Sequence, residues 1–172
     1  NNKIRAGNAG SDIQISAKGE DAIGVLALVH GSVDLKGKNA VINAESGGNL
    51  ASEGIHVQNN NMTDTDHRAI VNVNTENTTI HADSALVAMS NSVLNVNSNL
   101  VTNGKNAILT RGNSDVNINM DGKHTTQLNG DIVFNYDGAS SGTVIDSNVN
   151  VNLNGEGSFW TGNTKVEWNN GN

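Results

Sequence analysis

A short pattern recurs three times between Ser84 and Leu153. Each copy has a small residue, an aliphatic run, a turn rich in Ser, Asn and Gly, and a stretch in which aliphatic residues alternate with Asn; the copies span 84–97, 106–119 and 142–153. Repetition at a period of 20–50 residues is typical of solenoids and related arrays. The pattern opens at Ala22, Gly54, Ala85, Ala107 and Thr143, with steps of 32, 31, 22 and 36 residues.

The unequal steps indicate a bare unit of about 22 residues that carries insertions, because loops tolerate added length at low entropic cost. We expect the insertions at Glu45–Glu53, Gln58–His67 and Met120–Gly142. Val, Ile and Thr alternate with polar residues over short stretches, and Gly, Asn, Asp and Ser separate these stretches. This spacing favours short strands over helices throughout the chain.

A three-strand unit of this size cannot bury its aliphatic side alone, whereas stacked units bury it together. The sequence therefore predicts an all-β fold: a single-stranded parallel β-helix with about six or seven coils of three short strands. The inward side chains are expected at Val33, Leu35, Leu94, Val96, Val116, Ile118, Val149 and Val151. The side chains between them, which should point outward, are Asp34, Asn95, Asn117 and Asn150.

Composition agrees with this architecture and excludes several others. Pro is absent, as interior strands paired on both sides require. Asn occurs 31 times, and Asn suits left-handed turn positions and stacked amide ladders. The net charge is −7 and the ten Lys and Arg form no run, so no nucleic-acid partner is predicted. The absence of Cys excludes disulfides and thiolate metal sites.

The aromatic residues divide one domain, residues 1–172, into two parts. All five lie in the last 40 positions: Phe134, Tyr136, Phe159, Trp160 and Trp168. We therefore distinguish main coils over 1–127 from aromatic-rich C-terminal coils over 128–172. Because large rings bury more area than Val, we expect the C-terminal coils to be the most stable and to open last.

Three C-terminal segments resemble a known family. They are Leu128-Asn-Gly-Asp-Ile132, Asn148-Val-Asn-Val-Asn-Leu153 and Gly157-Ser-Phe-Trp-Thr-Gly162. In this order they are similar to the end of the passenger domain of autotransporters (type V secretion), of the pertactin and self-associating adhesin type. The resemblance implies a right-handed β-helix, a cell-surface or secreted location in a Gram-negative bacterium, a signal peptide before Asn1 and an outer-membrane β-barrel translocator after Asn172.

Two groups of polar residues are candidates for a cation-binding or catalytic site. Asp64-Thr-Asp66-His67 offers oxygen and imidazole ligands for a divalent cation, but it lacks the Gly and terminal Glu of an EF-hand and fits a solvated loop better. Arg68, Arg111, Asp115 and Asp146 lie near unit openings, where a polysaccharide-degrading enzyme would need converging charges. No nucleophile elbow is present. We predict no catalytic residue, metal or cofactor.

The function predicted is a cell-surface adhesion or self-association module with a rigid β-helix stalk. Its partner would be a host surface glycan or protein, or another copy of itself, contacted by the outward Asn, Ser and Thr rows or by the loop Gln58–His67. A carbohydrate-degrading β-helix enzyme (polysaccharide lyase or hydrolase) and a purely structural spacer remain the alternatives.

Overall fold

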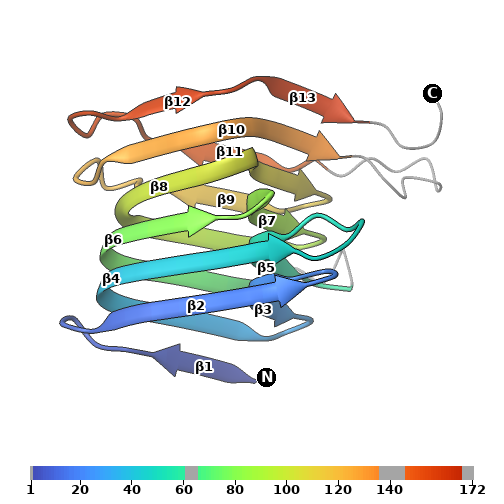
Figure 1. Cartoon of the computed structure of the whole chain (residues 1–172), viewed down its shortest axis with the longest axis horizontal. Coiled ribbons are helices and arrows are strands. Elements are labelled where there is room, and N and C mark those ends of the chain that lie inside the picture. Colours follow the sequence, from blue (N-terminus) through green and yellow to red (C-terminus); the bar gives the residue numbers. More distant parts are fainter. Residues whose placement is uncertain (1, 61–65, 136–145, 168–172) are drawn as a thin grey trace.

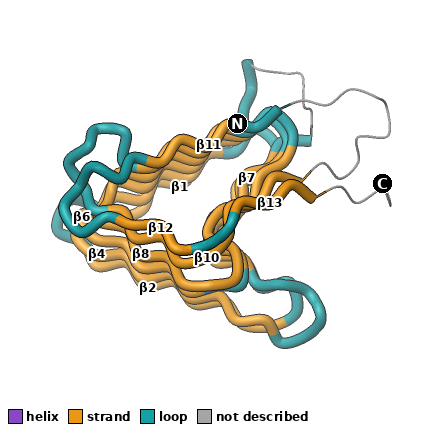
Figure 2. The backbone as a smooth tube through the Cα atoms, turned by 90° about the horizontal axis from the view of Figure 1, so that it is seen from above, coloured by secondary structure: helices purple, strands orange, loops and turns teal. Residues whose placement is uncertain are grey.

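The computed structural model describes residues 2–60, 66–135 and 146–167, and all regular structure in them is β-strand. Thirteen strands form one curled sheet in which every pairing is parallel, an arrangement compatible with a β-solenoid. The strands stack from β1 at one end to β12 and β13 at the other (Figure 1). Seen along the stack, the strands superimpose in three walls (Figure 2).

Each wall is defined by its pairings. Wall 1 consists of β1 (Lys3–Ala6), the first parts of β4 (Ser32–Ser46), β6 (Ala69–His81) and β8 (Ser92–Arg111), then β9 (Asp115–Ile118) and β11 (Asn148–Val151). Wall 2 consists of β2 (Asp12–Gly19), the later parts of β4 and β6, the middle of β8, the first part of β10 (Thr126–Asn135) and β12 (Phe159–Thr161). Wall 3 consists of β3 (Ile23–Leu28), β5 (Glu53–Gln58), β7 (Ser84–Met89), the ends of β8 and β10, and β13 (Thr164–Glu167).

The register confirms the predicted inward columns. Val33 pairs with Val71, Val71 with Leu94, Leu94 with Val116, and Val116 with Val149. All of the predicted inward residues up to Ile118 are buried, whereas Val149 and Val151 are only partly buried against the same core. Period-two alternation thus places the aliphatic columns inside the walls and leaves the intervening side chains outside.

One predicted detail, the loop at Met120–Gly142, is wrong. Met120–Gly142 is not simply an inserted loop, because β10 (Thr126–Asn135) runs through it and carries walls 2 and 3 onward. The segment that stacks on the third part of β8 is Asp131–Phe134. Ile132, for example, pairs with Ile108, which lies 24 residues earlier in the chain. The unit therefore reopens near Asp131, and Thr143 lies outside the described residues.

The strands are also longer than predicted, because they bend round corners without losing their pairing. β8 alone contributes to all three walls over 20 residues. At the corner between walls 1 and 2, hydroxyls replace aliphatic side chains: buried Thr75 and Ser98 lie 2.7 Å apart (Oγ1 to Oγ), and Ser98 donates to Thr78 Oγ1 at 2.9 Å. These bonds satisfy polar groups where the backbone turns inward.

Candidate functional site

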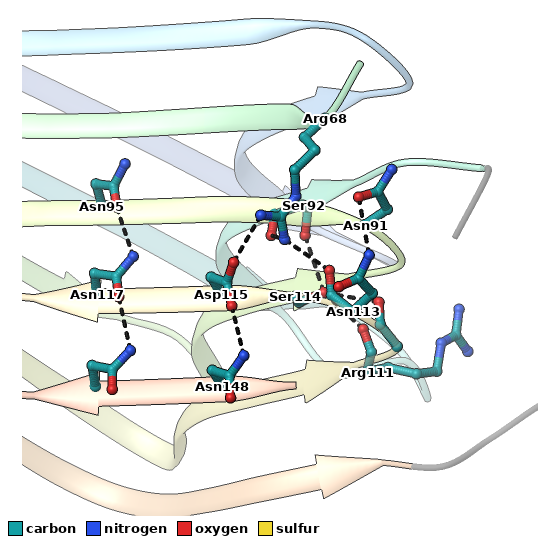
Figure 3. Close-up of polar contacts among 12 residues, drawn as sticks. Arg68, Asn91, Ser92, Asn95, Arg111, Asn113, Ser114, Asp115, Asn117 and Asn148 are labelled. Carbon is teal, nitrogen blue, oxygen red and sulfur yellow. Dashed lines mark hydrogen bonds and ion pairs between the residues drawn. The ribbon is translucent and has the colours of Figure 1, made fainter. Parts of the chain in front are cut away.

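Rows of hydrogen-bonded side chains cover the outer surfaces of walls 1 and 2. On wall 1, Asn72 donates through Nδ2 to Asp34 Oδ1, Asn95 to Asn72, Asn117 to Asn95, and Asn150 to Asn117, all at 2.9–3.0 Å. Figure 3 shows the Asn95–Asn117 part of this row. We call the five side chains, Asp34, Asn72, Asn95, Asn117 and Asn150, the wall 1 ladder. The residues predicted to face outward are four of its members.

A second row runs along wall 2. Asn39 donates to Asp12 Oδ1 at 2.9 Å, Asn77 to Asn39 at 3.0 Å, and Asn99 to Asn77 at 3.3 Å. We call Asp12, Asn39, Asn77 and Asn99 the wall 2 ladder. Its last amide oxygen accepts from the backbone N–H of Thr125 at 2.9 Å. The hydrogen-bonded side chains therefore follow the spacing of the paired strands, about 4.8 Å from one strand to the next.

Both ladders have the same direction, and an aspartate explains it in each case. An ionised carboxylate only accepts hydrogen bonds, so the neighbouring Asn must turn its Nδ2 toward the aspartate. Its Oδ1 then faces the next Asn, which must donate in turn. One acidic residue at the N-terminal end thus orients every amide above it, and the side-chain dipoles align with their positive ends toward the carboxylate.

The predicted charged cluster converges only in part. Arg68 Nη1 lies 2.7 Å from Asp115 Oδ2, and Arg68 Nη2 donates to the carbonyl oxygens of Ser92 at 3.1 Å and Asn113 at 2.9 Å. Arg68 precedes β6, so the guanidinium joins the starts of three successive layers of wall 1 (Figure 3). Arg111 points away from this contact in Figure 3, and Asp146 is exposed.

Asp115 also has a fixed ionisation state. Burial raises the pKa of its carboxyl, but hydrogen bonds from Asn148 and Arg68 and the Arg68 charge outweigh that, so the pKa lies below its ordinary value. Asn148 donates at 3.0 Å to the carboxylate oxygen that Arg68 leaves free. The pair fastens strands together: both terminal nitrogens of Arg68 and both carboxylate oxygens of Asp115 have partners within the fold, whereas Arg68 Nε is buried without one among the described residues. This is the arrangement of a structural ion pair rather than of an acid–base centre.

The loop Gln58–His67 is described only at its two ends. Asn59 is buried and donates from Nδ2 to the His67 carbonyl at 2.5 Å, which closes the base of the loop. The His67 ring stacks on His30 with centroids 4.9 Å apart. Asp64 lies outside the described residues, so the candidate cation site on Asp64, Asp66 and His67, which the sequence disfavours, is not tested. Elsewhere in the described chain, no three metal-ligating side chains come together.

Sequence reasoning missed a polar cluster on wall 3. His56, only 8% exposed, sits between acceptors: Nδ1 lies 2.5 Å from Glu53 Oε2, and Nε2 lies 2.8 Å from Gln58 Oε1. Burial lowers the pKa of the imidazole, but the hydrogen bond and charge of Glu53 more than offset this, so the pKa is raised. The spacing of Glu53, His56 and Gln58 on one strand was the only available signal, and their convergence needed the coordinates.

A polar hollow of about 670 Å³ lies at the outer corner between walls 2 and 3. His81, Asp83 and Asn103 contribute to its lining, and the longer loop after β4 forms one side. Asp83 Oδ2 is already engaged, because it accepts from the N–H of Ser52 at 2.8 Å and from its hydroxyl at 3.2 Å. The hollow therefore offers imidazole and amide groups, together with the carboxylate of Glu45, to an external ligand.

Comparison with known proteins identifies no relative: no protein-family model, curated protein or solved structure matches the chain. Within the described residues no helix is long and apolar enough to cross a bilayer. Evidence for a function therefore comes from the residues and contacts of this chain alone.

Proposed function

We propose that this chain is an adhesion or self-association module of the autotransporter passenger type, displayed on or secreted from a Gram-negative bacterium. In this proposal the curled sheet is a right-handed, single-stranded β-helix of about six or seven three-strand coils. The full protein would continue into an outer-membrane β-barrel translocator. The partner is a second copy or a surface glycan or protein of the host.

The C-terminal turn that carries the family resemblance has a clear physical role, which supports the proposal. Trp160 Nε1 donates to the Gly130 carbonyl at 2.9 Å, so the ring is tied across from β12 to β10. A Cβ on Gly162 would lie 2.0 Å from that same oxygen. The Ser-x-Trp-x-Gly pattern therefore combines a ring that reaches the preceding layer with a residue small enough to let it approach.

The wall 1 ladder is the observation that carries the adhesion proposal. An Asn amide has two N–H donors and two acceptor lone pairs, and an internal ladder position uses one of each. Asn72, Asn95 and Asn117 each retain one donor and one acceptor. Since these amides are half-buried and held in place by their neighbours, little side-chain entropy remains to be lost on binding.

The chemistry of this surface selects its partners. Donors and acceptors alternate at about 4.8 Å along a straight row. A matching amide row on another copy, or the hydroxyls of a glycan, satisfies both kinds of group. The ladder above Asp34 is neutral, which matters because two chains of net charge −7 repel one another elsewhere.

Bead aggregation by the purified chain tests the proposal. The double variant Asn95→Val/Asn117→Val removes two central amides but keeps residues that suit a strand. We expect beads carrying the unaltered chain to aggregate and beads carrying this variant to disperse. Asn77→Val/Asn99→Val on wall 2 is the matched control and should aggregate nearly as well. Circular dichroism and thermal unfolding establish that both variants are folded.

Two results would contradict the proposal. If the unaltered chain neither aggregates beads nor binds a panel of glycan-coated surfaces, the spacer alternative gains support. If the wall 1 and wall 2 variants behave alike, the wall 1 ladder is not the contact surface. Turnover of acidic polysaccharides by the purified chain would instead favour the enzymatic alternative.

A further inference from the structure

The two ends of the strand stack both leave apolar side chains uncovered. At the C-terminal end, the walls leave an apolar hollow of about 340 Å³ lined by Leu128, Ile132, Phe134, Val149, Val151, Leu153, Trp160 and Thr164. At the N-terminal end, side chains of the inward columns are solvent-accessible: Ile4 is 59% exposed, and Ile13 and Ile15 are only partly buried. Both ends therefore leave apolar side chains uncovered, and the C-terminal end is hollowed.

The strand edges match as well. Among the described residues, β1, β2 and β3 each pair on one side only, and so do β11, β12 and β13. The first three begin walls 1, 2 and 3 in that order, and the last three end the same walls in the same order (Figures 1 and 2). Because every pairing is parallel, each C-terminal edge has the direction and spacing that an added N-terminal edge requires.

We propose that copies of this chain stack head to tail, with β1, β2 and β3 of one copy pairing with β11, β12 and β13 of the next. The proposal is independent of the wall 1 ladder, because it uses the ends of the stack and not its sides. The unpaired backbone groups of the edges gain partners, and the apolar hollow is filled.

Extending the observed register shows which side chains would meet. The column Ile4, Val33, Val71, Leu94, Val116 and Val149 would continue with Ile4 of the next copy above Val149. The wall 2 column that begins at Ile15 ends at Trp160, so these two would pack together. The wall 3 column from Ala27 ends at Val166, which is 69% exposed in one chain and would be covered.

The outer surface fits the same arrangement. Arg5 pairs in register with Asp34, at the base of the wall 1 ladder, and Asn150 is the last member of that ladder. Stacking places the Arg5 guanidinium of the next copy beside the amide of Asn150, whose oxygen can accept from it. The ladder then passes from one copy to the next without bringing like charges together.

Such a contact is heterologous, because two different surfaces meet, and it leaves a free end of each kind on every assembly. We therefore expect the 172-residue chain to form assemblies that grow with concentration beyond two copies. Sedimentation velocity and light scattering over a wide concentration range measure this directly. A chain that remains single, or an assembly that stops at two copies, overturns the proposal.

Variants at each end locate the interface. Ile4→Asp alters the N-terminal edge and Val166→Asp the C-terminal edge, and both side chains are exposed enough in the single chain for a carboxylate to be solvated. Covering one large aliphatic side chain is worth about 1.5–3 kcal/mol, so each variant should weaken association roughly tenfold to a hundredfold. Leu50→Asp is the matched control, because Leu50 is 55% exposed on a side loop, and it should associate normally.

Mixing the two edge variants separates loss of the interface from loss of the fold. The Ile4→Asp chain keeps an intact C-terminal end, and the Val166→Asp chain keeps an intact N-terminal end. An equal mixture should therefore form a complex of two chains and grow no further, although each variant alone stays single. If the mixture forms no complex, or if Leu50→Asp associates as poorly as the edge variants, stacking by these edges is wrong.

Discussion

The centre of the strand stack and its C-terminal end contain the same local sequence with different burial. Leu94 and Val116 are 0% exposed, whereas Val149, the next residue in the same column, is only partly buried. All three are followed by Asn and then by another aliphatic residue. What differs is that β11 has a described strand on one side only. Burial in this fold is therefore set by neighbouring layers, as expected when each layer contacts only the next.

The difference in burial argues that the centre of the stack, and not its C-terminal end, opens last on unfolding. The prediction that the C-terminal coils open last assumed that their aromatic rings are buried. Phe159 is 40% exposed, Phe134 and Trp160 are partly buried, and Tyr136 and Trp168 lie outside the described residues. We now expect amides of β6 and β8 to exchange hydrogen most slowly, by orders of magnitude relative to β12 and β13, because only global unfolding exposes the centre. Slowest exchange at Phe159–Thr161 would restore the original prediction.

Truncating one side chain in each region should sharpen the difference. Leu94→Ala leaves a cavity between fully paired layers and should lower the free energy of unfolding by about 2–5 kcal/mol. Val149→Ala, in the same column, should cost roughly 1 kcal/mol or less, because its surroundings are partly solvated. Chemical denaturation of both variants gives the comparison. Equal losses would mean that something covers the C-terminal end in solution.

The inward columns were predictable because a parallel stack repeats one simple rule. Leu94, Val116 and Ile118 alternate with Asn. When one face of a strand is buried, this alternation allows only one orientation, with the aliphatic side chains inside. The outward position of Asn95 and Asn117 follows from the same rule. The sequence also predicts that Asn side chains form ladders, because identical residues in register bring their amides together.

Other features depend on contacts that no local pattern encodes. The sequence predicts a loop where β10 lies, because the repeat step is longer there. In the structure Gly130 has a φ of 137°, and a register shift at that point turns the strand from wall 2 into wall 3. The direction of the ladders depends on which residue ends each row, which requires the register over five layers. Arg68 and Asp115 are 47 positions apart, and only the stacking brings them together.

A buried corner residue offers a second contrast between the regions. Asn119, 0% exposed with φ of 55°, donates to Ser98 O at 2.7 Å and Thr126 Oγ1 at 2.8 Å, and its Oδ1 accepts from the N–H of Ser98 at 2.8 Å. Asn119→Ala strands those partners in the interior and should cost about 2–3 kcal/mol. Asn152, whose backbone N–H binds the Ile118 carbonyl one layer on, is half-exposed, and Asn152→Ala should cost less than about 1 kcal/mol. Similar melting temperatures for the two variants would show that the buried hydrogen bonds of Asn119 do not stabilise the fold more than the half-exposed contacts of Asn152 do.

The ladder allows a smaller, directional test. Asn95→Asp replaces a donor with an acceptor directed at Asn72 Oδ1, so it should destabilise the fold by about 1–2 kcal/mol at neutral pH. Asn150→Asp makes the same chemical change at the C-terminal end, where no further Asn is described above it, and should cost less. Asp34→Asn leaves an amide that can still accept from Asn72, so its effect should be near zero. A large loss in Asp34→Asn would show that the carboxylate charge, not its position, holds the row.

The smallest expected effect is a pH dependence that belongs to the centre of the stack. Because the pKa of His56 is raised in the folded chain, the folded state binds the proton more tightly than the unfolded state does. The resulting stabilisation is complete below the unfolded pKa of about 6.5 and is lost as pH rises through the higher folded value. Melting temperature should therefore fall as the pH rises above about 6.5. Glu53→Gln removes the partner that raises the pKa and should flatten this dependence. An unchanged slope in Glu53→Gln would assign the effect to a group other than His56.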